Sequence, residues 1–270
     1  MPSAKQPRVH DEPAYVLHHH DWSESSLILE VFSRQHGRVA LVAKGVKRPT
    51  SQFRPVLLPL QPLRLSWGGD AEVRTLKAAH WQGGHVMPLG DALLSGYYLN
   101  ELVMRLLARD DPHPDLFEHY AHAVAALAQG EVAQAAVLRA FELLLLRDTG
   151  FLPALNEEGT SLGPLRQDVR YELVPEAGLR AASHPQTLAC ECAQWLNLQA
   201  ALDGTGPFDA LLACCADDRG GALRQQLRTL LHYHSGVRAF KTRQLLADIQ
   251  RLCQAVPVHA PATESTPDRP

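Results

Sequence analysis

The chain has 270 residues, of which 46% are hydrophobic, and its formal net charge is −3. This apolar content suffices for one large or two modest domains, and the small negative charge excludes attraction to nucleic acid through bulk charge. No apolar run approaches the roughly 20 residues that span a bilayer, and the first residues lack the apolar core of a secretory signal. Five cysteines, an odd number, do not indicate a disulfide framework, so the composition predicts a cytoplasmic protein.

Before residue 80 the pattern predicts short β-strands. Apolar residues alternate with polar ones, and turn residues such as Gln35-His36-Gly37 separate the alternating segments. The predicted strands are residues 14–20, 26–33, 38–43, 60–67 and 71–79. Five short strands with a long connection between the third and the fourth are typical of a small Greek-key barrel of the OB type. An SH3-like barrel is the alternative.

After Pro88 the apolar residues recur every three or four positions, which predicts helices. The predicted helices are residues 91–109, 114–128, 131–148, 185–202, 221–234 and 241–254. Residues 169–173 and 179–182 predict a small β-hairpin inserted between helices, and the proline-rich residues 256–270 predict a disordered tail. The predicted fold class is α+β. Its domains are an OB-type barrel in residues 1–82, a mainly helical domain in residues 83–254 with a hairpin near 168–182, and a tail in residues 255–270.

Positive charge is concentrated in the first part of the chain. Residues 1–80 hold 11 lysines and arginines against 7 acidic residues, whereas the remainder holds 15 against 22. No acidic residue occurs between Val31 and Gly69, and the seven basic residues of this stripe are Arg34, Arg38, Lys44, Lys47, Arg48, Arg54 and Arg64. Such a stripe in an acidic protein favours polyanion binding over an ordinary solvated face. Trp22, Phe53 and Trp67 are candidates for stacking on bases, although a core position explains Trp67 better.

A second stretch without acidic residues runs from Arg219 to Ala247. Its candidate polyanion contacts are Arg224, Arg228, Lys241 and Arg243. Arg224 and Arg228 lie four residues apart on one face of a predicted helix, away from its apolar face. The stretch either extends a nucleic-acid track beyond the barrel or pairs with acidic neighbours in the helical domain.

The predicted helix 131–148 presents a different combination. Arg139, Leu143 and Arg147 fall at every fourth position and so share one face. Two guanidinium groups around an apolar residue suit an acidic peptide that ends in an aromatic side chain and a free carboxylate. The alternative is that these arginines pair with Glu142 or Glu191.

No metal site or catalytic site is predicted. Cys190 and Cys192, like Cys214 and Cys215, are too close in sequence to point the same way on a helix, so buried thiols are favoured over zinc ligands. The three histidines 18–20 alternate between strand faces and cannot all reach one ion. Phosphate-binding loops, zinc-protease motifs and serine-hydrolase motifs are missing, which predicts a protein that is not an enzyme and needs no cofactor. A nuclease or ligase-like enzyme with a distributed site is the alternative.

Several segments, in order along residues 14–250, resemble the RecO family of DNA repair proteins. They are Ala14-Tyr-Val-Leu-His18, Trp22-Ser-Glu-Ser-Ser-Leu27, Glu30-Val-Phe-Ser33, Gly37-Arg-Val-Ala-Leu-Val-Ala-Lys-Gly45, Leu60-Gln-Pro-Leu63, Tyr98-Leu-Asn-Glu-Leu102, Leu138-Arg-Ala-Phe-Glu-Leu143, Gly150-Phe151 and Lys241-Thr-Arg243. The resemblance implies an N-terminal OB domain, binding of single- and double-stranded DNA, strand annealing, and loading of the recombinase RecA together with RecR. It also implies that the C-terminal tail of single-stranded DNA-binding protein docks on the helical domain, near Arg139.

Some members of that family carry a four-cysteine zinc site after the Gly-Phe pair, but residues 152–159 of this chain contain no cysteine. We therefore expect no zinc here. The sequence as a whole predicts a cytoplasmic, nucleoid-associated mediator of DNA repair and recombination that acts by binding. A generic OB-fold protein that binds structured RNA is the alternative.

Overall fold

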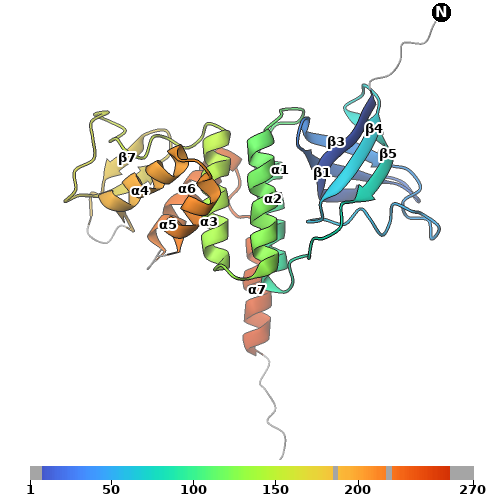
Figure 1. Cartoon of the computed structure of the whole chain (residues 1–270). Coiled ribbons are helices and arrows are strands. Elements are labelled where there is room, and N and C mark those ends of the chain that lie inside the picture. Colours follow the sequence, from blue (N-terminus) through green and yellow to red (C-terminus); the bar gives the residue numbers. More distant parts are fainter. Residues whose placement is uncertain (1–7, 185–187, 217–220, 256–270) are drawn as a thin grey trace, which may run out of the picture.

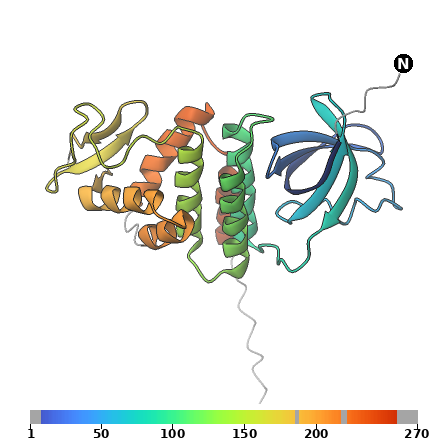
Figure 2. The ribbon, with the colours of Figure 1, turned by 45° about the horizontal axis from the view of Figure 1, so that its top comes forward.

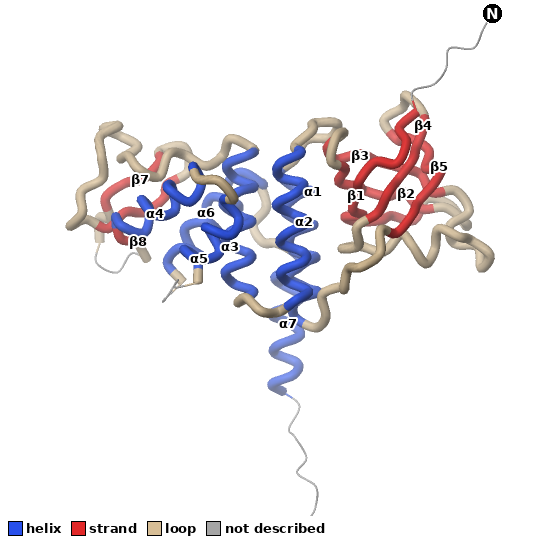
Figure 3. The backbone as a smooth tube through the Cα atoms, in the orientation of Figure 1, coloured by secondary structure: helices blue, strands red, loops and turns tan. Residues whose placement is uncertain are grey.

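The computed structural model describes residues 8–184, 188–216 and 221–255. The chain forms a β-barrel, a central group of helices and a second, smaller sheet (Figure 1). The two sheets lie at opposite ends of the molecule with the helices between them (Figure 3). The predicted fold class, α+β with an N-terminal five-stranded barrel before a mainly helical part, is confirmed. The predicted tail lies outside the described residues, except for Ala255 at the end of the last helix.

Five strands close the barrel, which lies to one side of the helices (Figure 2). They are β1 (Arg8–Asp21), β2 (Leu27–Ser33), β3 (Gly37–Ala43), β4 (Leu63–Gly68) and β5 (Val73–Trp81). The order around the barrel is β1-β2-β3-β5-β4, with β3 and β5 parallel and the other neighbours antiparallel. This arrangement is that of an OB fold and not of an SH3-like barrel.

Alternate strand residues fill the barrel. Leu29, Leu41 and Leu65 are almost fully buried, as the period-two pattern predicts. Trp67 is 2% exposed and its ring contacts His36 edge to face, so its predicted core position is confirmed. Strand β1 starts earlier than predicted. Its pairing with β4 shifts register between Val9 and Glu12, and this shift interrupts the alternation of apolar and polar residues from which the start of the strand was predicted.

Seven helices and a three-stranded sheet follow in the described part of the chain. The helices are α1 (Asp91–Leu106), α2 (Pro114–Gln129), α3 (Gln134–Asp148), α4 (Cys192–Asp203), α5 (Pro207–Cys215), α6 (Ala222–Ser235) and α7 (Lys241–Ala255). The strands are β6 (Arg170–Val174), β7 (Gly178–Ala181) and β8 (Cys190–Glu191), in the order β7-β6-β8. None of the described helices combines the length and apolar character needed to cross a lipid bilayer.

Two elements of the helical part differ from the prediction. The predicted hairpin forms from β6 and β7, and β8 adds a third strand where residues 185–202 predict continuous helix. Helix α5 was not predicted, because nine residues show too little of the 3.6-residue period to stand out. Gly206 in the left-handed conformation and Pro207 at the first position mark its start.

A shared apolar core joins the barrel to the central helices. Tyr15 of β1 packs against Phe117 and Tyr120 of α2, with ring centroids 5.5 and 5.0 Å apart. Asn100 of α1 donates its side-chain N–H to the Leu17 carbonyl at 2.9 Å and accepts the Tyr120 hydroxyl. Because these contacts are buried and hydrogen-bonded, the barrel is held in one orientation on the helices.

The same helix α1 also holds the start of α7. Glu101 of α1 is buried, and its carboxylate accepts the backbone N–H groups of Lys241 at 2.9 Å and Thr242 at 3.0 Å. A carboxylate at this place satisfies free N–H groups of the first turn and complements the helix dipole. Lys241 is thereby fixed close to the end of β1, where its charge acts on His18.

Candidate nucleic-acid interface

The basic stripe between Val31 and Gly69 is not free of acidic neighbours in space, which corrects the expectation from the sequence. Four of its seven cations face a carboxylate from outside that window. The ion pairs are Arg34–Glu118 at 2.9 Å, Arg38–Glu30 at 3.6 Å, Lys47–Asp21 at 2.7 Å and Arg64–Asp11 at 3.8 Å. Paired cations offer less net charge to a phosphate, so the stripe is weaker than its count suggests.

Arg38 is the most buried of the four. Its side chain is 17% exposed, its Nε has no hydrogen-bond partner in the structure, and burial lowers the pKa of its guanidinium. Glu30, the partner of Arg38, also accepts a hydrogen bond from Arg109, which in turn pairs with Glu72 at 2.7 Å. Arg38 therefore belongs to a partly buried ion-pair cluster, and presents less of its charge to solvent than the sequence predicts.

Lys44, Arg48 and Arg54 form the part of the stripe that is both exposed and without an ion pair among the described residues. All three side chains are exposed, and none of them forms an ion pair with a described residue. Lys44 and Arg48 line a surface pocket of about 380 Å³ at the end of β3. Exposed cations that line a hollow on an OB barrel suit phosphate binding.

The β1–β2 turn also lines this pocket. Trp22, Ser23, Ser25 and Ser26 of the turn line it together with Val42, Gly45 and the two cations. Trp22 is 66% exposed, in contrast to the buried Trp67, and Phe53 is partly buried. Of the three aromatic candidates named from the sequence, Trp22 is therefore the one that presents its ring to solvent beside unpaired cations.

A second exposed tryptophan was missed. Trp81 at the end of β5 is 54% exposed and donates its indole N–H to the Gln61 side chain at 3.0 Å. It follows the last predicted strand, and nothing in the sequence around it marks it as a surface residue. It does not line the pocket of Lys44 and Arg48.

The comparisons with known proteins agree in assigning a family. The family model described as "Recombination protein O N terminal" matches residues 8–84, and "Recombination protein O C terminal" matches residues 89–171. A protein named DNA repair protein RecO from Variovorax paradoxus (strain S110) is 60% identical over 253 residues, which cover 91% of this chain and 98% of the relative. The chain belongs to the RecO family. Its relative of the same name from Polaromonas naphthalenivorans (strain CJ2) is 61% identical over 249 residues, with the same coverage.

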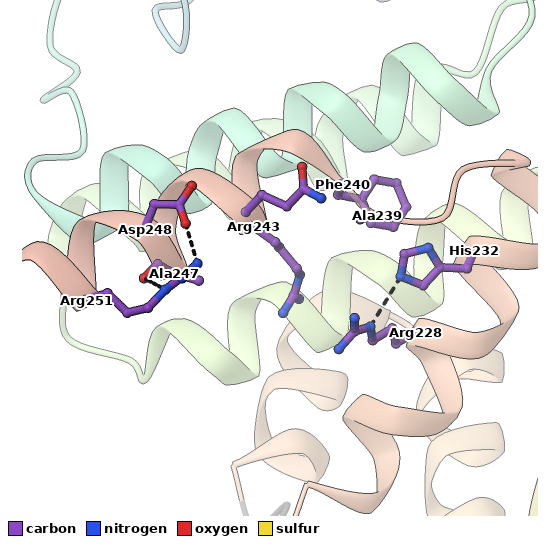
Figure 4. Close-up of a pocket in the computed structure, with 9 residues that line it drawn as sticks. Arg228, His232, Ala239, Phe240, Arg243, Ala247, Asp248 and Arg251 are labelled. Atoms are coloured by element: carbon purple, nitrogen blue, oxygen red, sulfur yellow. Dashed lines mark hydrogen bonds and ion pairs between the residues drawn. The ribbon is translucent and has the colours of Figure 1, made fainter.

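The predicted second basic stretch of this RecO-family chain lies on α6 and α7. Arg219 falls outside the described residues, whereas Arg224, Arg228 and Lys241 are exposed. Figure 4 shows Arg228 of α6 and Arg243 of α7 pointing toward one another across a groove of about 510 Å³, with Arg251 further along α7. The Arg228 Nε–H donates to His232 at 3.2 Å, and Arg251 pairs with Asp248 at 2.5 Å.

The side chain of Arg243 is half-buried and contacts buried residues. Its guanidinium lies 4.3 Å from the centre of the Tyr98 ring and 3.3 Å from the Glu142 carboxylate. Tyr98 donates its hydroxyl to the same Glu142 oxygen at 2.8 Å, and burial together with the charge of Glu142 raises the pKa of Tyr98. Arg243 is thus half-buried, which corrects its expected place on an open cationic face.

The predicted face of Arg139, Leu143 and Arg147 is not a surface of the RecO-family fold. Arg139 is 3% exposed and pairs with Glu142 at 2.6 Å, and Leu143 is fully buried. Arg147 lies at the far end of α3 and donates to the Leu202 carbonyl at 2.8 Å. Helix α3 packs against α2, α5 and α6, so these three residues do not form an exposed face of an amphipathic helix. The alternative from the sequence, a pair between Arg139 and Glu142, is the observed one.

Arg139 instead lies at the edge of a groove between α1, α3, α6 and α7. The groove is about 520 Å³ in volume, and among its lining residues are Leu138, Arg139, Arg243 and Leu246. The Arg139 Nε is buried and has no hydrogen-bond partner in the structure. The combination that the sequence led us to expect, apolar side chains beside arginines, is therefore present with different members.

The cysteines and histidines form no metal-binding group among the described residues. Cys190 belongs to β8 and Cys192 begins α4, and both are buried. The rings of His18 and His20 meet at 4.6 Å at the exposed end of β1. Burial, and then the charges of the neighbouring His20 and His19, lower the pKa of His18, which favours the neutral form of this ring.

Proposed function

We propose that the protein binds single- and double-stranded DNA through its barrel, anneals complementary strands, and with RecR helps RecA to load onto DNA coated by single-stranded DNA-binding protein. The observation that carries this proposal is the pocket of Lys44 and Arg48, whose charges no carboxylate among the described residues neutralises. Membership of a family of DNA repair proteins supports DNA as the polyanion. The protein acts by binding and presenting strands, without breaking or making bonds.

Two cationic regions give annealing a physical basis. The barrel provides the pocket of Lys44 and Arg48, and Arg228 and Lys241 lie on the helical part with no described acidic partner. Strands that are held on cationic surfaces repel one another less, because each bound phosphate releases counterions and no longer contributes its full charge. The bases remain free to pair when contact is made through phosphates.

Reversing the two pocket charges is expected to weaken DNA binding. We expect Lys44→Glu/Arg48→Glu to lower the affinity for single-stranded DNA by about 10- to 100-fold at low salt, because two phosphate contacts are replaced by repulsion. The slope of log affinity against log salt is expected to fall by about 1.4, or roughly 0.7 per lost contact. Titration of a fluorescent oligonucleotide at several salt concentrations measures both quantities.

Arg166→Glu/Arg180→Glu is the matched control for this charge reversal. Both arginines are exposed; Arg180 belongs to β7, and the Arg166 N–H donates to the hydroxyl of Tyr171 in β6. The double substitution changes the total charge by the same amount as the pocket variant. If the control variant loses as much affinity as the pocket variant, net charge and not the pocket governs binding. Unchanged binding by a folded pocket variant would overturn the barrel site.

We further propose that the groove beside Arg139 binds the acidic C-terminal tail of single-stranded DNA-binding protein. Arg139→Lys retains a positive charge next to Glu142 but removes the planar guanidinium fork. We expect about a tenfold loss of affinity for a synthetic acidic peptide that ends in an aromatic residue and a free carboxylate, measured by fluorescence anisotropy. Arg147→Lys, the same change on the same helix outside the groove, is expected to have no effect. Full affinity in the Arg139 variant would exclude Arg139 from docking.

The RNA alternative is tested with the same titration. We expect an unpaired DNA oligonucleotide to be bound and annealed to its complement faster than the uncatalysed rate. Comparable affinity for structured RNA without accelerated DNA annealing would favour a generic OB-fold RNA-binding protein. Cleavage or joining of strands in the presence of magnesium would favour an enzyme.

A further inference from the structure

The indole ring of Trp22 is exposed to solvent, although its burial would be favourable. Its side chain is 66% exposed in the turn between β1 and β2, although burial of an indole ring is favourable by a few kcal/mol. A single exposed tryptophan is common on protein surfaces, so exposure alone assigns no role. The surroundings of the ring decide whether it can act as a binding surface.

Backbone contacts hold the turn that carries Trp22. The Trp22 and Ser23 N–H groups both donate to the Ser26 carbonyl, at 3.2 and 3.4 Å. Lys47 also binds this turn: its backbone N–H donates to the Ser25 carbonyl at 3.0 Å, and its ammonium group donates to the Ser23 carbonyl at 3.1 Å. The ring is therefore presented by an ordered backbone, which lowers the entropic cost of binding a flat ligand on it.

Lys47 consequently has a role in the site that differs from that of the other cations. It pairs with Asp21 at 2.7 Å while it holds the turn, so its charge is neutralised and its position is fixed. The cations left for a ligand in this pocket are Lys44 and Arg48, which line it together with Trp22. An aromatic ring and two positive charges in one pocket match one nucleotide unit, whose base is flat and whose phosphate is anionic.

We propose that Trp22 is a stacking platform for an unpaired base and that it makes the barrel site select single-stranded over double-stranded DNA. This inference rests on the proposed function, since it assumes that Lys44 and Arg48 bind the phosphates of the same strand. In a duplex both faces of each base are covered by neighbouring bases, so no face is available to the indole. In an unpaired strand any base can stack, because every base has a π face.

The test separates the base from the phosphate. The probes are an oligothymidylate and an abasic deoxyribose-phosphate oligonucleotide of the same length and charge, each labelled with fluorescein. We expect the parent protein to bind the base-bearing probe about tenfold more tightly. Trp22→Ala is expected to lose this preference while its affinity for the abasic probe stays unchanged, and Trp22→Phe is expected to retain most of it, because a smaller aromatic face remains.

Two matched variants locate the effect. Trp81→Ala removes the other strongly exposed tryptophan of the barrel, which lies outside the pocket, and is expected to keep the tenfold preference. Lys44→Glu/Arg48→Glu is expected to weaken binding of both probes. Thermal melting of each variant shows whether it is folded. We expect Trp22→Ala to leave the melting temperature unchanged, because the side chain is exposed.

The outcomes distinguish the two proposals. If Trp22→Ala keeps the preference for bases while the charge reversal weakens both probes, the barrel binds DNA but Trp22 is not the platform. If neither variant changes binding of either probe, the barrel site itself is wrong, and the stacking proposal fails with it. Equal affinity of the parent for the two probes would overturn stacking by any residue at this site.

Discussion

Glu142→Gln is expected to lower the free energy of unfolding by about 3–5 kcal/mol, although the substitution hardly changes the volume of the side chain. One oxygen of this buried carboxylate accepts hydrogen bonds from Arg139 at 2.6 Å, Tyr98 at 2.8 Å and Arg243 at 3.3 Å. An amide in its place leaves the buried Arg139 guanidinium without a counter-charge, and Arg243 with only the ring of Tyr98. Removing one member of a buried ion pair costs more than the pair contributes, because the remaining charge stays desolvated.

Urea unfolding followed by circular dichroism measures this loss. Asp148→Asn is the matched control, because it makes the same chemical change on the same helix. The partner of Asp148, Arg147, is one-third exposed, and water replaces part of the lost interaction. We expect about 1 kcal/mol or less for the control. A loss of that small size for Glu142→Gln would show that the buried network contributes no more than the partly buried pair of Arg147 and Asp148.

Gly37→Ala is expected to destabilise the junction between barrel and helices by about 3 kcal/mol or more. Gly37 has φ of +64°, and a Cβ at this position would lie 1.9 Å from the backbone oxygen of Asp111 in the α1–α2 connection. A backbone atom cannot rotate away as a flexible side chain can. The neighbouring residues of the two segments are also hydrogen-bonded, since the Asp110 N–H donates to the Arg38 carbonyl at 2.9 Å. The methyl group would therefore push the β2–β3 hairpin away from the helices.

Gly130→Ala is the control that isolates this clash. Gly130 follows α2 with φ of +71°, and nothing lies within 4 Å of the position that a Cβ would take. Both substitutions carry the same penalty for a left-handed backbone, about 1 kcal/mol, and only one of them meets another segment. Equal losses in the two variants, measured by thermal unfolding, would show that the close approach at Asp111 is unimportant.

Most of the barrel and the long helices could be predicted because their patterns are local. Alternation in β2 and β3, and three- or four-residue spacing in α1 and α3, follow directly from which side chains face the interior. The short elements β8 and α5 were not predicted, because they contain too few residues to show a hydrophobic period. They are stabilised by packing on their neighbours, which a short window of sequence does not contain.

The candidate site was predicted less well than the fold. Lys44 and Arg48 lie where the sequence suggests, on a pocket of the barrel. The three residues Arg139, Leu143 and Arg147 do not form one exposed face, because Leu143 is fully buried where α3 packs against its neighbouring helices, and only Arg139 of the three lines a groove. Trp22 became a specific candidate only when its exposure could be compared with that of Trp67.

The sequence by itself determined the α+β class, the OB-type barrel, the family and the excess of positive charge in the first 80 residues, since each of these is written in local pattern and composition. Only the tertiary structure decided which of those charges are available. Asp11, Asp21, Glu30 and Glu118 come from outside the stripe and neutralise four of its seven cations. Ion pairing acts over a few ångströms, and the distance between two residues in space is set by the fold and not by their separation along the chain.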